Sequence, residues 1–494
     1  DPALPVTATL EAMNPLLPGD ADASGIPAAL LRWKITNVSA APLKASVFCL
    51  LANPASGAGS VARVEQDGMM KVTMTLSPGP EQGTQTFSRV WLEIPLRPEF
   101  ATLRVTSPST WGRADNAGGV HGPVAWPFKP SVWLGNEEKG LCWFCESDEG
   151  FRPADGNRVV EVLPGERETV LRIRLLEGGA KTVLPAVWTF GLQATPVKPF
   201  DRSWSENFVY HMVGETKADG TREKVWKTLA KDDPVGRLMV PVERAKAAGA
   251  KAVVFHEDWV RIQNDPSYQP AFKAVVDACQ ARGIKVLVYL GFELSPLDPE
   301  WPRWQGEALR RDASGEASGW WYREPAQHDY MLCYASGYSK TWLERAKRAY
   351  LELGINGYFL DGTIIPQGCA NARHGCGWTD AAGVRHESYP IFAVREMMRE
   401  LYEFVDAHGG VVNAHQSGYV CPATLSFCHA YWDGEQIAYN QDDIRGHLDL
   451  EVFRAEFMGV NHGVPCEFLS AEKPGLWTHE DALAVSLLHN VLPR

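Results

Sequence analysis

The stretch of sequence that decides the fold is KAVVFHEDWVRIQNDPSYQPAFKAVVDACQARGIKVLVYLGFE, residues 251–293. Two short apolar runs, at 251–258 and 285–293, flank a segment at 272–283 whose apolar residues recur at helical spacing. Short apolar runs predict buried strands, and two such strands joined by a helix form a βαβ unit with parallel strands. This stretch therefore predicts a parallel sheet that is covered by helices.

The same alternation continues from about residue 205 towards the C-terminus. Further strands are predicted at 207–213, 356–362, 411–417, 429–435 and 466–471, which makes seven in all. Further helices are predicted at 240–249, 339–354, 391–409 and 450–460. No glycine-rich phosphate-binding motif opens any of them, so a nucleotide-binding sheet is disfavoured. The pattern favours a (β/α)8 TIM-type barrel whose eighth strand lies beyond Arg494 or is replaced by an irregular closure.

The N-terminal part of the chain has a different pattern. β-branched and aromatic residues gather at 29–40, 43–53, 69–77 and 86–96, separated by clusters of turn-forming residues. Residues 158–178 alternate on both sides of a Pro-Gly pair and predict a hairpin. We therefore expect a multidomain protein, with an N-terminal antiparallel β-sandwich at 1–198 and the barrel at 199–494 as the catalytic domain.

Composition excludes several classes of partner. The net charge of −12, without a basic block, argues against nucleic acid, and no apolar run is long enough for membrane insertion. No motif calls for a cofactor, and nothing indicates the oligomeric state. The chain opens at Asp1-Pro2, which resembles a processed end, and we expect a periplasmic or secreted protein.

Two cysteines lie close together after the fourth predicted strand. Cys369 and Cys376 bracket the segment ANARHG, and we expect a local disulfide between them. A metal site made by these two thiols and His374 is the weaker alternative.

Five predicted strands of the barrel end in polar side chains. In barrel enzymes the functional residues follow the C-terminal ends of the strands, where they meet at one mouth. Packing alone does not explain why five apolar strands each end in polar side chains. In chain order the five ends are His256-Glu257-Asp258-Trp259, Glu293, Asp361, Asn413-Ala414-His415 and Trp432-Asp433-Gly434-Glu435.

The predominance of carboxylates in this ring favours glycoside hydrolysis, which needs one carboxyl as the acid and a second as nucleophile or charge stabiliser. We predict Asp361 in the second role and Asp433 or Glu435 as the acid/base. These last two face the same side if the strand continues to Glu435. Alternatively, the Glu257-Asp258 pair supplies one of the two roles.

Several side chains near the mouth suit a carbohydrate substrate. Hydrogen-bonding groups can hold hydroxyls, and flat aromatic rings can stack on the apolar faces of sugars. The predicted substrate-binding residues are His256, Glu257, Asp258, Trp259, Glu293, Trp320, His374, Asn413, His415 and Trp432. Residues 362–390 are expected to form a long structureless loop that acts as a lid or subsite wall, with His374 and Trp378 as contacts.

Two other functions fit the same residues. A metal-dependent hydrolase could bind an ion with His256, Asp361, His415 and Asp433, although no H-x-H or H-E-x-x-H motif is present. An inactive carbohydrate-binding protein is the other alternative, and the carboxylates of the fourth and sixth strands argue against it.

Four segments resemble those of bacterial proteins related to glycoside hydrolase family 123: WLGNEEKGLCWFCESDEGF (133–151), FGLQATPVKP (190–199), INGYFLDGT and YWDGEQ. The resemblance implies a sandwich followed by a barrel. It also implies N-acetyl-β-galactosaminidase activity through an adjacent Asp-Glu pair. This chain departs from that pattern because Gly362 follows Asp361. The placement of Asp361 and Asp433 on the fourth and sixth strands is instead similar to α-galactosidase-like barrels.

Overall fold

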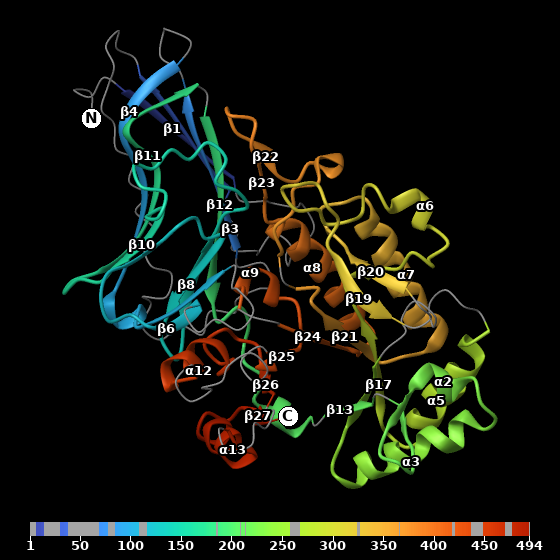
Figure 1. Ribbon diagram of the computed structural model, residues 1–494. Coiled ribbons are helices and arrows are strands. Elements are labelled where there is room, and N and C mark those ends of the chain that lie inside the picture. The colour runs from blue at the N-terminus through green and yellow to red at the C-terminus, as the bar shows by residue number, and fades with distance from the viewer. Residues whose placement is uncertain are drawn as a thin grey trace.

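The computed structural model describes residues 6–13, 30–37, 69–77, 84–107, 116–183, 186–207, 209–212, 214–256, 267–323, 327–364, 366–416, 420–435, 448–469 and 477–493. Within these ranges an N-terminal part rich in antiparallel strands precedes a part made of parallel strands and helices (Figure 1). None of the helices in these ranges has the length and apolar character needed to cross a membrane.

The N-terminal part contains two sheets. The larger has the order β1-β2-β3-β12-β9-β8-β5-β6 and the smaller β4-β11-β10-β7. Their strands are β1 (Val6–Met13), β2 (Leu30–Asn37), β3 (Met69–Ser77), β4 (Thr84–Leu96), β5 (Leu103–Ser107), β6 (Ala117–Gly119), β7 (Val124–Trp126), β8 (Ser131–Gly135), β9 (Gly140–Phe144), β10 (Val160–Leu163), β11 (Thr169–Val183) and β12 (Ala186–Thr195). The hairpin predicted at 158–178 is confirmed as β10 paired with β11, whereas the strand predicted at 43–53 lies outside the described residues.

One apolar cluster joins these two sheets. Leu92 and Ile94 of β4 belong to the same buried cluster as Trp143 of β9 and Phe190 of β12. The intervening side chains of β4 are only partly buried, so the strand alternates between a core face and an outer face. The core of this part therefore lies between the larger and the smaller sheet.

The second part is built on eight strands in the order β13-β16-β17-β21-β24-β25-β26-β27, with every neighbouring pair parallel. They are β13 (Val209–Met212), β16 (Ala252–Phe255), β17 (Lys285–Leu290), β21 (Gly357–Asp361), β24 (Val411–His415), β25 (Ala430–Asp433), β26 (Cys466–Phe468) and β27 (Leu492–Pro493). Each of the seven predicted segments contains one strand. The expectation that the eighth strand is missing was wrong, because the very short β27 pairs with β26 inside this chain.

Each of the five predicted helical segments overlaps a helix of the structure, whereas the helix before β27 was not predicted. The main ones are α3 (Pro234–Ala247), α5 (Gln269–Gln280), α7 (Tyr338–Leu353), α8 (Ile391–Ala407), α12 (Leu450–Glu456) and α13 (His479–Leu488). Shorter elements are η2 (Pro98–Phe100), η4 (Arg202–Glu206), β14 (Gly214–Thr216), β15 (Arg222–Lys224), α2 (Val225–Leu229), α6 (Trp301–Trp304) and α9 (Pro422–Leu425).

The eight-stranded sheet is curled, and its two faces pack against different partners. Val254, Tyr289, Phe359 and Ala430 come from four strands yet share one buried cluster on the inner face. Residues that alternate with them, such as Tyr358, belong to a larger cluster that includes the helices and part of the N-terminal sheet. This arrangement is consistent with a TIM-type domain.

Two long insertions leave the sheet at neighbouring strand ends. The first follows β17 and contains β18 (Glu293–Leu294), β19 (Gly319–Arg323) and β20 (Gln327–Met331). The second, after β21, was predicted to be structureless, which was wrong. It contains η5 (Ala372–His374), β22 (Trp378–Thr379) and β23 (Arg385–His386). Its end is fixed to the N-terminal part, since the Tyr389 N–H donates to the Glu146 carbonyl at 2.7 Å and Trp378 Nε1 donates to Asp148 at 3.1 Å.

Candidate active site

Asp361 is the last residue of β21 and accepts hydrogen bonds from both neighbouring strands. The Tyr289 hydroxyl, on β17, lies 2.6 Å from Asp361 Oδ2, and His415 Nδ1, on β24, lies 2.8 Å from Oδ1. Burial by itself would raise the pKa of Asp361, but the bonds from His415 and Tyr289 and the charge of the imidazole outweigh it and lower the pKa to about 2. This carboxylate is therefore ionised at neutral pH.

Glu435 lies on the other side of the same imidazole. Its Oε2 is 3.4 Å from His415 Nε2, so one ring faces a carboxyl group at each nitrogen. Burial raises the pKa of Glu435, and the negative charge of Asp361 adds to that effect while His415 opposes it. The two carboxyl groups thus differ in the pH at which each loses its proton, Asp361 being the stronger acid.

Asp433 takes a different position. The strand β25 ends at Asp433, so it does not continue to Glu435 as the same-face expectation required. Trp432 lies against the inner cluster, which places its neighbour Asp433 on the outer face of the strand, where it is fully buried. Asp433 Oδ1 accepts the N–H of Gly434 at 2.7 Å. The structure therefore gathers Asp361 and Glu435 around His415, with Asp433 stabilising the turn that follows β25.

Glycine is required directly after Asp361. Gly362 has φ of 62°, and a side chain there would place its first carbon 2.2 Å from Cε1 of Phe292. Only glycine adopts this conformation readily and leaves room for the aromatic ring. The Asp-Gly pair thus lets the chain turn sharply away from β21 and leaves the carboxylate at the strand end.

Aromatic and imidazole rings surround the two carboxyl groups on the inner face. The ring of Trp432 lies 3.9 Å from that of His415 and runs nearly parallel to that of His211 at 6.0 Å. His256 lies 4.4 Å from Tyr289. Three predicted residues, His256, His415 and Trp432, are therefore brought together at the mouth.

The sequence reasoning missed His211 on β13 and Tyr289 on β17. Each lies at an inward position of its strand, with Tyr289 two residues after Leu287 of the inner cluster. Alternation along the strand therefore carried the signal that could have found both residues. The prediction considered only the residues at the strand ends and therefore did not include these two.

Asn413 lies two residues before His415 on β24, further from the strand end. Its side-chain amide donates to Glu467 Oε1 at 3.0 Å, and the indole of Trp204 donates to the same oxygen at 3.0 Å. Asn413 and Glu467 are both fully buried. This geometry gives Asn413 a structural partner inside the sheet.

The remaining predicted contacts are placed in several regions. Glu293 lies on β18, partly buried, at the start of the first insertion. Trp378 stacks on His386 at 4.3 Å and bonds to the N-terminal part, as described above. Glu257, Asp258 and Trp259 lie outside the described residues, and only the backbone of Trp320, in β19, is described.

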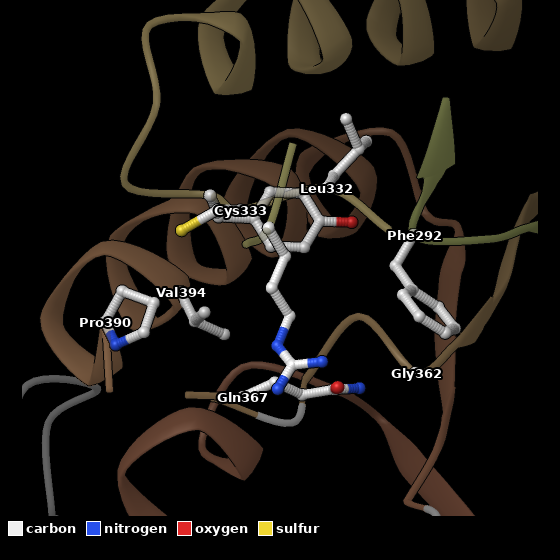
Figure 2. A pocket seen from close by; sticks show the side chains of 9 residues that line it. Phe292, Leu332, Cys333, Gly362, Gln367, Pro390 and Val394 are labelled. Carbon is white, nitrogen blue, oxygen red and sulfur yellow. The ribbon is translucent and has the colours of Figure 1, made fainter. Parts of the chain in front are cut away.

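A small hollow, partly open to solvent, lies beside these strand ends (Figure 2). Phe292 and Gly362 border one side of it, and Pro390 and Val394 border the other. The hollow adjoins the residue that follows Asp361, whereas Asp361, His415 and Glu435 do not line it. We therefore place the candidate site on the carboxyl groups, with the hollow as its neighbour.

One group in the described part of the chain has the geometry to hold a metal ion, and it is away from the carboxylates. It consists of Cys333, Cys369, His374 and Cys376. The predicted disulfide between Cys369 and Cys376 is wrong, because both are free thiols. His374, which was predicted as a sugar contact, lies in this group. The alternative metal site at the barrel mouth is not assembled, since Asp433 faces outward.

Comparison with protein families found one match, at the N-terminus. Residues 1–94 match the family model described as beta-glucosidase 2, glycosyl-hydrolase family 116 N-term. Comparison with curated proteins gave no match. The narrower resemblance to family 123 is not confirmed and stays a prediction, whereas similarity to a glycoside hydrolase is supported over this N-terminal stretch.

Two solved structures are similar to the larger part of the chain. One is an α-N-acetylgalactosaminidase from Bifidobacterium bifidum, with 12% identity and a TM-score of 0.45, covering 80% of this chain and 70% of that one. Another is an α-galactosidase from Thermus thermophilus, with 14% identity and a TM-score of 0.43, covering 83% and 85%. Both are glycosidases, but at this level of likeness their substrates say nothing about the substrate of this chain.

Proposed function

We propose that this protein hydrolyses glycosidic bonds, with Asp361 as nucleophile or charge stabiliser and Glu435 as acid/base. The observation that carries this proposal is the position of the two carboxyl groups at the two nitrogens of His415, with their pKa values moved in opposite directions. Glycoside hydrolysis needs this division of labour between one ionised and one protonated carboxyl.

The geometry fits the roles. Asp361 is held at the strand end by Tyr289 and His415, so its charge is fixed in place before a substrate binds. Glu435 is only partly buried, so its proton can reach a leaving oxygen. A single imidazole between them is compatible with the separations of roughly 5–9.5 Å at which such carboxyl pairs act.

His415 acts as a positioning residue in this scheme. An ionised carboxylate only accepts hydrogen bonds, so Nδ1 carries the proton towards Asp361. Nε2 then faces Glu435, and any movement of one carboxyl group affects the other through this ring. The ring contact with Trp432 restricts its rotation.

The family-model match at residues 1–94 independently supports glycosidase activity. Within this proposal the N-terminal sheets form a β-sandwich, the parallel sheet forms a (β/α)8 barrel, and the protein acts on an oligo- or polysaccharide in the periplasm or outside the cell. The metal-dependent alternative at the barrel mouth has lost its support, because Asp433 does not join His256, Asp361 and His415.

A hydrolysis screen tests the proposal. Purified protein would be incubated with α- and β-linked aryl glucosides, galactosides and N-acetylgalactosaminides, and with natural polysaccharides. We expect release from at least one plain glycoside, and the anomer first formed, followed by NMR, distinguishes retention from inversion. Release from acetamido sugars alone would indicate substrate assistance and make Asp361 an orienting group. Binding of a polysaccharide without any turnover would support the inactive binding protein.

A further inference from the structure

Four potential metal ligands converge in the insertions that follow β17 and β21. Cys333 comes from the end of the first insertion, and Cys369, His374 and Cys376 come from the second. Their ligand atoms all lie within 4.8 Å of one another. Cys333, Cys369 and Cys376 are 3%, 0% and 4% exposed, so the group is closed off from solvent on the side of the thiols.

The distances within this cluster match a tetrahedral site. Cys333 Sγ and Cys376 Sγ are 3.7 Å apart, and Cys369 Sγ and His374 Nε2 are 3.4 Å apart. Zinc binds sulfur at about 2.3 Å and nitrogen at about 2.0–2.1 Å, so tetrahedral angles separate two sulfurs by about 3.8 Å and a sulfur from a nitrogen by about 3.6 Å. Both of these pairs are therefore spaced as zinc ligands are, and the other distances stay within 4.8 Å.

Backbone groups around the cluster form hydrogen bonds with its ligands, as they do in metal sites. His374 Nδ1 lies 2.5 Å from the carbonyl oxygen of Glu307, so Nδ1 carries the proton and Nε2 points its lone pair towards the cysteines. The N–H of Asn371 donates to Cys369 Sγ at 3.4 Å. Such bonds stabilise a thiolate, which is the form that binds a metal.

Positive charge is also near. Three thiolates with one divalent ion leave a charge of −1, and the Arg385 guanidinium donates to the carbonyl of Ala370 at 3.1 Å and to that of Cys376. Disulfide formation does not explain the cluster, because three thiols cannot all pair. The sulfur–sulfur distance of 3.7 Å is also much longer than the bond of about 2.05 Å.

We propose that Cys333, Cys369, His374 and Cys376 bind a structural zinc ion. Four protein ligands leave no open coordination position for water or substrate, so the ion stabilises the fold and takes no part in catalysis. It joins the end of the first insertion to the second. Cys333 also borders the hollow that Gly362 and Phe292 line, so the ion fixes the wall beside the candidate active site.

The metal content of the full-length protein tests this inference directly. Protein carrying a purification tag without histidines would be dialysed against metal-free buffer and its zinc measured by mass spectrometry. We expect one zinc per chain in the wild type and a loss of at least tenfold in Cys369→Ser. The matched control is Cys279→Ser, because Cys279 is an equally buried thiol on α5 outside the cluster, and it should keep its zinc.

Two further measurements keep the test decisive if Cys369→Ser fails to fold. His374→Cys should retain zinc, because four thiolates bind the ion as well as three thiolates and an imidazole do. Cobalt added to zinc-depleted wild type should give the intense thiolate-to-cobalt charge-transfer absorption of a tetrahedral sulfur-rich site.

The inference is independent of glycosidase activity, since none of these readouts involves a substrate. Metal-free wild type from zinc-supplemented cells, without a charge-transfer band on cobalt addition, would overturn it. So would a disulfide between Cys333 and Cys376 found by peptide mapping of protein purified without reductant.

Discussion

Two carboxylates on the parallel sheet have similar hydrogen bonds and very different surroundings. Asp361 accepts from Tyr289 and His415, and Glu467 accepts from Trp204 and Asn413. The side chain of Asp361 is 25% exposed, whereas Glu467 is fully buried. Hydrogen bonding alone therefore does not separate the carboxylate proposed to react from a structural one.

What separates them is access and the presence of a second carboxyl group. Near Asp361, the far side of His415 meets Glu435, which is partly exposed and, in the proposed mechanism, donates a proton to the substrate. Glu467 accepts from an indole and an amide, and neither of these two groups titrates near neutral pH. We therefore expect changes around Asp361 to affect turnover and changes around Glu467 to affect the free energy of unfolding.

The largest effect is expected from Asp361→Asn. Asparagine keeps the size of the side chain and removes the charge, so turnover of every substrate should fall by roughly 10⁴-fold or more, the scale of losing a catalytic nucleophile. The thermal midpoint should change little. Steady-state kinetics and a thermal melt measure both, with Asp277→Asn on the exposed face of α5 as the control. Wild-type turnover by Asp361→Asn would remove this carboxylate from the mechanism.

Glu435→Gln should affect substrates according to their leaving group. A general acid contributes about 10²–10⁴-fold when the leaving oxygen needs a proton and little when the leaving group is a dinitrophenolate. We therefore expect a large loss on alkyl or natural glycosides and a small loss on dinitrophenyl glycosides. The comparison is made as kcat/KM for both substrates in both proteins.

The pH profile gives a second readout of the same variant. Since burial raises the pKa of Glu435, wild-type activity should fall as pH rises through that pKa, because the acid is then deprotonated. The remaining activity of Glu435→Gln on a dinitrophenyl glycoside should lack this fall. Equal losses on both classes of substrate, with the fall retained, would assign the acid role to another residue.

Asn413→Ala tests the structural side of the comparison. It removes a hydrogen-bond donor to the buried Glu467, which should cost about 1–3 kcal/mol of unfolding free energy. KM should stay within about twofold of wild type, as no substrate contact is lost. Trp204→Phe removes a second donor and should behave alike. A raised KM at unchanged stability in Asn413→Ala would make Asn413 a substrate contact after all.

The strands and helices of the barrel could be predicted because their apolar periodicity is strong, as in residues 251–293. The eighth strand could not, since Leu492–Pro493 is too short to show a period. The order within residues 362–390 could not be predicted, because it depends on contacts with the N-terminal part, such as Trp378 with Asp148. Such contacts have no local signal in the sequence.

The sequence predicted which strand ends form the candidate site, but not which face of its strand each side chain occupies. Asp361 and Glu435 were chosen because polar residues follow apolar strands, and they do approach His415. Asp433 shows the limit of this prediction. Side chains alternate between the two faces of a strand, so a shift of one position along the strand moves a carboxylate to the other face. Cys333 was missed for another reason: it is distant in sequence from Cys369, and only the fold brings the two together.

The smallest effect is expected from Tyr289→Phe, which keeps the ring and removes one hydrogen bond to Asp361. Burial raises the pKa of Asp361 while His415 and Tyr289 lower it, so losing the hydroxyl should raise that pKa from about 2. Because the ionised form is the active one, the acidic limb of the kcat/KM profile should move to higher pH, by about one unit or less. Turnover at neutral pH should fall by tenfold at most.

Phe359, a neighbouring inward ring without a hydroxyl, offers the control, since Phe359→Leu changes packing without changing that limb. An unmoved limb in Tyr289→Phe would mean that His415 alone sets the charge of Asp361, and the analogy with the doubly bonded Glu467 would then fail.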